Sequence, residues 1–116
     1  FAESLKDLIR IADDYKDSAQ FYLLRGNAYA AQNSPRQAFD DYDQAIARYN
    51  RDPRRNQDMR RQNLTEAYVN RGVMHFNLKD DYRAENDFRK ALAMDSLQDF
   101  AYNNLAQIYI RKNRYD

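Results

Sequence analysis

Residues 22–45 read YLLRGNAYAAQNSPRQAFDDYDQA, and residues 68–91 read YVNRGVMHFNLKDDYRAENDFRKA. Large aromatic and very small side chains occupy matching positions in the two stretches, at steps of 4, 3, 9, 4 and 3 residues. These positions are Tyr22, Gly26, Tyr29, Ala38, Tyr42 and Ala45 in the first stretch, and Tyr68, Gly72, His75, Ala84, Phe88 and Ala91 in the second. Small residues let two helices approach closely, and aromatic side chains fill the space beside them. The duplication therefore predicts a repeat protein built from paired helices.

The rest of the chain also has a helical pattern. A third copy of the pattern begins with Tyr102, Ala106 and Tyr109, and apolar residues elsewhere recur at helical spacing. Only two glycines and two prolines occur in 116 residues, which leaves few breaks for strands and turns. We therefore expect an all-α protein of about six helices. The helical pattern of the fourth helix is unambiguous from Leu64 onward, and that helix could start as early as Arg54. The expected ranges are about 2–15, 19–32, 35–52, 64–78, 82–94 and 97–112.

The spacing resembles that of the tetratricopeptide repeat, in which an aromatic residue, Leu-Gly, Tyr, a later Ala and a further aromatic residue recur every 34 residues. Tyr68 and Tyr102 are 34 residues apart, whereas Gly26 and Gly72 are 46 apart, which is 34 plus an insertion of 12. The resemblance implies one domain over 1–116, folded as a right-handed superhelical solenoid of antiparallel helix pairs. Its expected parts are an N-terminal helix of a preceding repeat or cap over 1–18, a repeat over 19–52, an insertion over 53–64, a repeat over 65–98, and the first helix of a further repeat over 99–116.

Some residues depart from the family pattern. Arg25 and Arg71 stand where the pattern prefers Leu, so we expect their stems to lie along the surface with their guanidinium groups in water. His75 replaces a Tyr, and we interpret it as an aromatic packing residue rather than a catalytic or metal-binding one. The repeated tyrosines, including Tyr102 and Tyr109, are expected to fill packing positions between helices.

The composition argues against several classes of function. Nineteen Lys and Arg balance eighteen Asp and Glu, a net charge of +1 that gives no general attraction to nucleic acid or acidic membranes. The chain has no Cys, one His, no Gly-rich phosphate loop and no apolar run of the roughly 20 residues that a membrane span needs. We therefore expect no enzyme activity, no catalytic residues, no cofactor, no metal and no membrane span. The compartment is left open, because the chain starts at Phe1 and is interpreted as a soluble fragment.

Two charged clusters have competing interpretations. Asp40, Asp41 and Asp43 lie early in an expected helix, and we interpret them as solvated residues that favour the helix dipole rather than as a metal site. The second cluster is a candidate anion patch for phosphate or an acidic partner, offset only by Asp52 and Asp58. Its residues are Arg51, Arg54, Arg55, Arg60 and Arg61. We favour a solvated loop or helix extension, because no aromatic side chain is present for base stacking, and nucleic-acid binding is the lesser alternative.

The resemblance implies a binding site in the concave groove that is lined by the first helices of successive repeats. The expected groove residues are Leu23, Asn27, Asn70, Val73, Phe76, Asn77, Asn103, Asn104 and Gln107. Amide side chains both donate and accept hydrogen bonds, so they suit the backbone of an extended peptide, although they could equally face water. Leu23, Val73 and Phe76 would supply apolar pockets. The resulting hypothesis is a non-catalytic scaffold or adaptor that binds a peptide or protein partner of unknown identity.

One activity of the family can be tested against the residues. Some members bind the acidic C-terminal tails of chaperones through a carboxylate clamp of two Lys, one Arg and two Asn. Asn27 and Asn70 match the asparagines, but the cationic positions fall on Leu23, Phe100 and Asn104. Tight binding of such tails is therefore not expected.

Self-assembly is the alternative function. The last expected helix has no second helix to cover its packing residues, and a solenoid normally needs a polar cap at such an end. A homo-oligomer could form through these exposed repeat ends.

Overall fold

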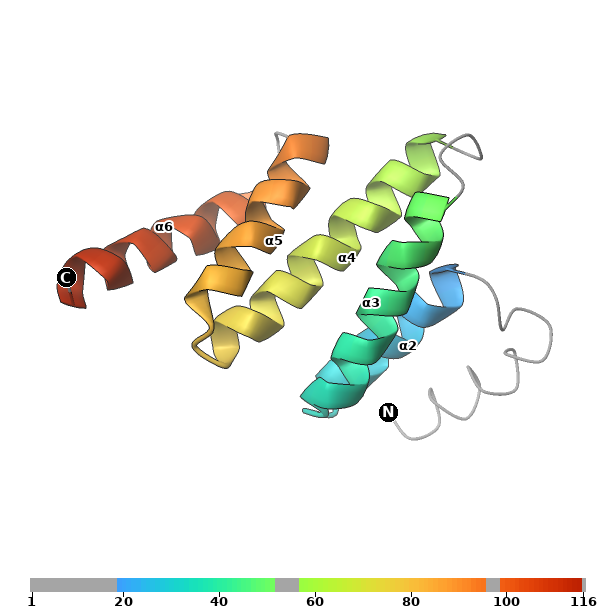
Figure 1. Ribbon diagram of the computed structural model, residues 1–116, viewed down its shortest axis with the longest axis horizontal. Coiled ribbons are helices and arrows are strands. Elements are labelled where there is room, and N and C mark those ends of the chain that lie inside the picture. The colour runs from blue at the N-terminus through green and yellow to red at the C-terminus, as the bar shows by residue number, and fades with distance from the viewer. Residues whose placement is uncertain (1–18, 52–56, 96–98, 116) are drawn as a thin grey trace.

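The computed structural model describes residues 19–51, 57–95 and 99–115, with the backbone alone for 57–59, 100, 114 and 115. The described residues form five helices and no strand (Figure 1). They are α2 (Ala19–Ala31), α3 (Pro35–Arg51), α4 (Gln57–Asn77), α5 (Asp81–Met94) and α6 (Asp99–Tyr115). The predicted all-α fold is confirmed. The helix expected over 2–15 lies outside the described residues.

The helices form two layers. Each helix packs against the next one in the chain, and α2 contacts α4 while α4 contacts α6. In contrast, the described residues of α3 and α5 make no close backbone contact. The principal extents are 49 × 33 × 19 Å, and the short dimension matches two helices of about 10 Å each. The stack therefore curves toward the layer of α2, α4 and α6, and the helices follow one another along the long axis (Figure 1).

Glycines mark the points where the two helices of a pair cross. A Cβ atom on Gly26 would lie 3.0 Å from the ring of Tyr42, and one on Gly72 would lie 2.8 Å from the ring of Phe88. Both rings are fully buried, so neither can move aside at low cost. The predicted pairing of small and aromatic residues is confirmed at both crossings, and it explains why α2 can lie so close to α3 and α4 to α5.

The turns between paired helices have the same geometry in both copies. Asn33 and Lys79 adopt left-handed backbone conformations, with φ of 57° and 65°. In each case the N–H of the following residue donates to the carbonyl five residues earlier, at 2.9 and 2.8 Å, which ends the first helix. Pro35 then starts α3, and Asp80 caps α5 by accepting a bond from the Arg83 N–H at 3.3 Å.

The additional residues between the two copies extend helices instead of forming one long loop. α3 has 17 residues and α4 has 21, whereas α5 has 14 and α2 has 13. Much of the segment expected as an insertion is therefore helical, because α4 starts at Gln57. Buried Tyr49 near the end of α3 and buried Leu64 in α4 belong to the same hydrophobic core. No helix in the described part of the chain is long and apolar enough to cross a bilayer.

The outer face of α6 differs from the corresponding faces of α2 and α4. Tyr102 and Tyr109 are 52% and 39% exposed, so the expectation that they are packed between helices is wrong for the described residues. Ala106, which corresponds to the buried Gly72, is exposed as well. The reason is that no described helix packs over this face as α5 packs over the equivalent face of α4. The Tyr109 hydroxyl does reach α5, where it donates to Glu85 at 3.2 Å.

Candidate functional site

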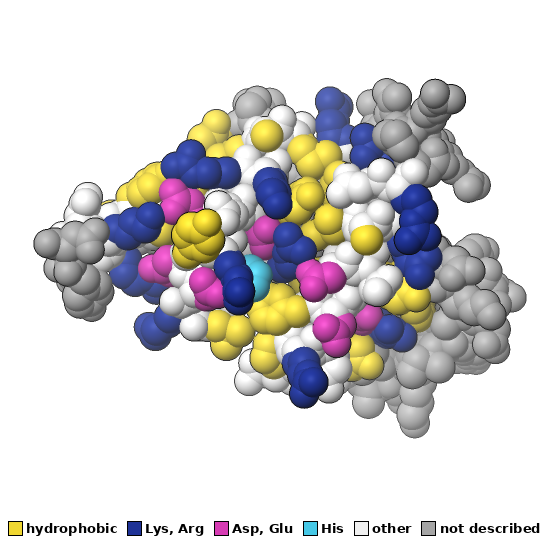
Figure 2. Space-filling view, in the orientation of Figure 1, with side chains coloured by type: hydrophobic (Ala, Val, Ile, Leu, Met, Phe, Trp, Pro, Cys, Tyr) yellow, Lys and Arg dark blue, Asp and Glu magenta, His cyan; other side chains and the backbone are white. Residues whose placement is uncertain are grey.

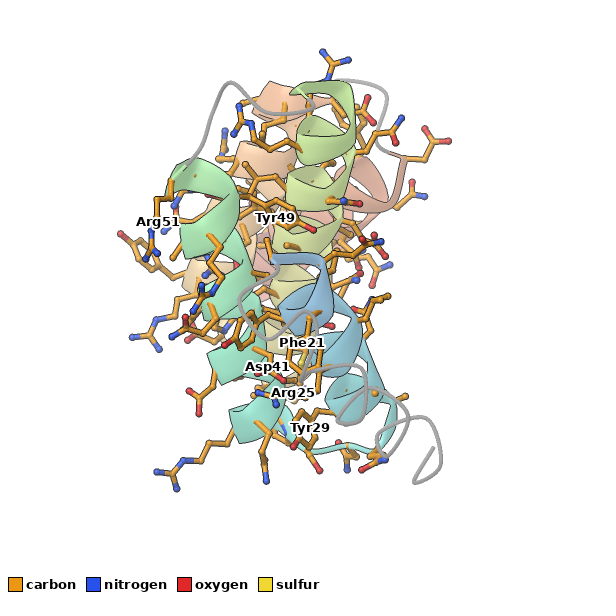
Figure 3. All side chains as sticks on the ribbon, turned by 90° about the vertical axis from the view of Figure 1, so that its right-hand side faces the viewer. Phe21, Arg25, Tyr29, Asp41, Tyr49 and Arg51 are labelled. Atoms are coloured by element: carbon orange, nitrogen blue, oxygen red, sulfur yellow. The ribbon has the colours of Figure 1, made fainter. Side chains whose placement is uncertain are left out.

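A buried Arg–Asp pair joins the two helices of each copy. Arg25 donates from Nε and Nη2 to the carboxylate of Asp41, both at 2.8 Å, and Figure 3 shows the two side chains meeting between α2 and α3. Arg71 makes the same two bonds to Asp87, at 2.9 and 2.8 Å. Each carboxylate residue is only 3% exposed. The expectation that both arginines end in water is therefore wrong, because a carboxylate on the facing helix meets each guanidinium.

Arg71 also connects neighbouring copies. Its Nη1 donates to Asp43 of α3 at 2.8 Å, so this side chain of α4 links α3 with α5. Burial opposes its charge, but the hydrogen bonds and charges of Asp87 and Asp43 raise the pKa of Arg71. The interpretation of the acidic cluster as solvated is correct for Asp40 and for Asp43, which is exposed although it pairs with Arg71. It is wrong for Asp41, which is buried and pairs with Arg25.

A hollow of about 390 Å³ lies between α2 and α4, on the concave side of the stack. It brings together four of the predicted groove residues: Asn27, Asn70, Val73 and Asn77. Its remaining walls come from small, apolar or amide side chains, and from the Tyr42 ring. None of the described residues that line this hollow is charged. It can therefore accept an uncharged chain segment without desolvating an ion pair.

A hydrogen-bonded network connects the walls of this hollow. The Oδ1 atom of Asn27 accepts a bond from the Tyr42 hydroxyl at 2.7 Å and another from Nδ2 of Asn70 at 2.9 Å. Burial, together with the charges of Glu66 and Asp41, raises the pKa of Tyr42, so its hydroxyl stays protonated and remains a donor. The network holds α2 and α4 in register and fixes the orientation of both amides.

A second hollow of about 440 Å³ continues along α4. Asn70 and Val73 belong to both hollows, and Gln62, Glu66 and Val69 line the second one. Asp95, just after α5, completes its rim. The two hollows together form one trough, which we call the α4 groove.

The other predicted groove residues lie elsewhere. Leu23 is 2% exposed and belongs to the core, so its assignment to the groove is wrong: its position on α2 turns inward. The ring of Phe76 is covered by the guanidinium of Arg111, 4.2 Å from its centroid, and Arg111 is itself bonded to Asp81. The three amides of α6 line neither hollow; they are Asn103, Asn104 and Gln107.

The opposite face carries a hollow that the sequence did not indicate. It has a volume of about 650 Å³ and lies between α3 and α5, with Arg71 and His75 of α4 at its base. Figure 2 shows the single His on this face among side chains of both charges. The imidazole stacks on Phe39 at a centroid distance of 4.5 Å, which agrees with its interpretation as an aromatic packing residue. Burial lowers the pKa of His75, although the charges of Asp87 and Asp80 oppose the shift.

The candidate anion patch is only partly within the described residues. Arg51 and Arg61 are exposed, while Arg54 and Arg55 lie outside the described part of the chain. Arg60 is half-buried and donates to the Tyr49 carbonyl at 3.4 Å, near the C-terminus of α3. A cation is favourable at that end of a helix, so Arg60 serves the junction of α3 and α4. Figure 3 places Arg51 toward the other end of α3 from the Arg25–Asp41 pair.

Replacing Arg71 tests the buried pair. The substitution Arg71→Leu, which restores the residue of the family pattern, should lower the free energy of unfolding by about 3 kcal/mol, because it leaves a buried carboxylate on Asp87 unpaired. Urea unfolding measures the change.

The double variant Arg71→Leu/Asp87→Leu should regain most of the lost stability, since no buried charge then remains. The control Arg83→Leu removes an exposed pair and should change stability by less than about 1 kcal/mol. Equal effects for Arg71→Leu and Arg83→Leu would contradict the assignment.

The titration of His75 gives a second prediction. Because burial lowers its pKa below the ordinary value of 6.5, the unfolded chain takes up the proton first as the pH falls. The contribution of neutral His75 to the free energy of unfolding should therefore be fully present above pH 6.5. It should decrease as the pH falls from 6.5 toward the pKa of His75 in the folded state. Unfolding free energies between pH 7.5 and about 5 measure this slope. The His75→Phe variant should lose it, since the chain has one His. An unchanged slope in that variant would refute the prediction.

Comparison with known proteins agrees with the repeated architecture. Residues 65–96, which include most of α4 and all of α5, match the family model described as tetratricopeptide repeat. No curated protein matches the chain, and no solved structure matches it. The copy in α2 and α3 has the same crossing, the same buried ion pair and the same turn as the matched copy. The copy in α4 and α5 is therefore a tetratricopeptide repeat, and the copy in α2 and α3 shares its architecture.

Proposed function

We propose that this chain is a non-catalytic interaction module whose α4 groove binds an extended segment of a protein partner. Tetratricopeptide repeats generally mediate protein–protein interaction, and the match over 65–96 supports that general role here. The observation that carries the proposal is the uncharged hollow between α2 and α4, in which amide and apolar side chains meet. Such a surface suits a polypeptide, which offers both backbone amides and apolar side chains.

The bond between Asn27 and Asn70 supports recognition of a peptide backbone. It uses the oxygen of Asn27 and the nitrogen of Asn70. The bond leaves the nitrogen of Asn27 as a donor and the oxygen of Asn70 as an acceptor, and these suit the C=O and N–H groups of a peptide backbone. Val73, next to both, provides apolar contact for a side chain of the same segment.

Filling the hollow tests this function. Asn77 is exposed and lines the hollow, so Asn77→Trp should block the groove while leaving the core intact. We expect partner capture from a lysate of the source cells, measured by quantitative mass spectrometry, to fall at least tenfold.

Asn86→Trp is the matched control for this experiment, because Asn86 is also an exposed Asn but lines the hollow on the opposite face. It should retain capture. If both variants retain the same partners, the α4 groove is not the binding site.

Self-assembly is a second candidate, and the outer face of α6 favours it. Tyr102 and Ile110 are 52% and 65% exposed there, and exposed apolar patches often mark interaction sites. Light scattering at increasing concentration should detect a dimer of the native chain, and Ile110→Lys should weaken that dimer. A strict monomer at about 100 μM would exclude self-assembly of physiological strength.

A further inference from the structure

The charges along the α4 groove have one sign. Of the residues that the structure describes, Glu66 and Asp95 line its two hollows, and no Lys or Arg does so. The hollow on the opposite face differs, because Arg71, Arg83 and Lys90 line it together with carboxylates. The groove therefore combines a neutral section near Val73 with an acidic section near Glu66.

Glu66 is placed to meet a ligand. It is exposed and lies one helical turn from Asn70 on the same side of α4. Within the described part of the chain, no Lys or Arg forms a salt bridge with Glu66. Its charge nevertheless reaches the groove wall, since it helps to raise the pKa of Tyr42, whose ring lines the groove. A cationic group in the groove would supply the opposite charge that the described residues do not provide.

The helix sets the dimensions of the ligand. The groove runs along α4 from Leu78 to Gln62, which is about 24 Å at 1.5 Å per residue. An extended chain rises about 3.3 Å per residue, so about seven residues fill it. Val73 and Glu66 are about 10 Å apart along the helix by the same measure, which corresponds to about three residues of an extended ligand.

We infer that the α4 groove selects a basic, extended segment of about seven residues and rejects acidic ones; this inference rests on the proposed function. An apolar side chain of the segment occupies the hollow at Val73, and a Lys or Arg about three residues away pairs with Glu66. An Asp or Glu at that position would face a carboxylate of the same sign, which costs affinity. The selectivity is opposite to that of a carboxylate clamp.

A displayed library of random heptapeptides tests the inference, with the full chain as bait. The native chain should enrich peptides with a Lys or Arg about three residues from a large apolar residue. Glu66→Lys should instead enrich Asp or Glu at that position. Glu66→Gln should lose the preference for either sign. Because Glu66 is exposed, these variants should fold, which circular dichroism checks.

Affinities of one enriched peptide complete the experiment. Fluorescence anisotropy at about 50 mM salt should show a Kd at least tenfold higher for Glu66→Lys, and the difference should shrink when the peptide's Lys or Arg is replaced by Ala. Enrichment that is lost in Asn77→Trp but is unchanged in Glu66→Lys would overturn the charge preference and leave the groove in place. Enrichment of acidic peptides by the native chain would overturn it too. No enrichment over Asn77→Trp would overturn both the preference and the proposed function.

Discussion

The close crossing of helices at Gly26 and Gly72 is the constraint on which the remaining structure depends. At each crossing the aromatic ring of the second helix lies against the glycine backbone, so the two helices approach closely enough for their neighbouring residues to meet. Arg71 directly precedes Gly72, and Asp87 directly precedes Phe88. The buried ion pair is thus a consequence of the crossing, and the same holds for Arg25 and Asp41 at the other one.

This arrangement fixes the register of each helix pair. A buried ion pair adds little net stability compared with a well-packed apolar pair, because both charges lose their hydration. A displacement along the helix, however, would leave a charge buried without a partner, which is costly. The Arg–Asp ion pairs therefore disfavour other axial alignments of the two amphipathic helices, which apolar packing alone would distinguish less well. In α6 the corresponding residue is Leu105, which is buried without an ion pair.

The two faces of the stack follow from the same geometry. Because α2 and α4 lie side by side, Asn27 and Asn70 meet and form the wall of the concave hollow. Because α3 and α5 spread apart, Arg71 reaches carboxylates on both of them and closes the base of the opposite hollow. One face offers amides, apolar groups and an exposed carboxylate, whereas on the other face Arg71 and Arg83 already pair with carboxylates. The difference explains why the concave face is the better candidate for binding a partner.

The sequence by itself determined the helices, their pairing and the small-to-aromatic crossings, because these depend on spacing within one helix or between helices joined by a short turn. It also indicated Asn27, Asn70, Val73 and Asn77, which meet in one hollow. Only the tertiary structure decided that Leu23 faces the core and that half-buried Arg25 and Arg71 pair with buried carboxylates. The separation of 16 residues between Arg and Asp in both copies was a signal for that pairing. Whether two residues 16 apart can pair depends on how far one helix is shifted along the other. That shift is set by the packing between the helices.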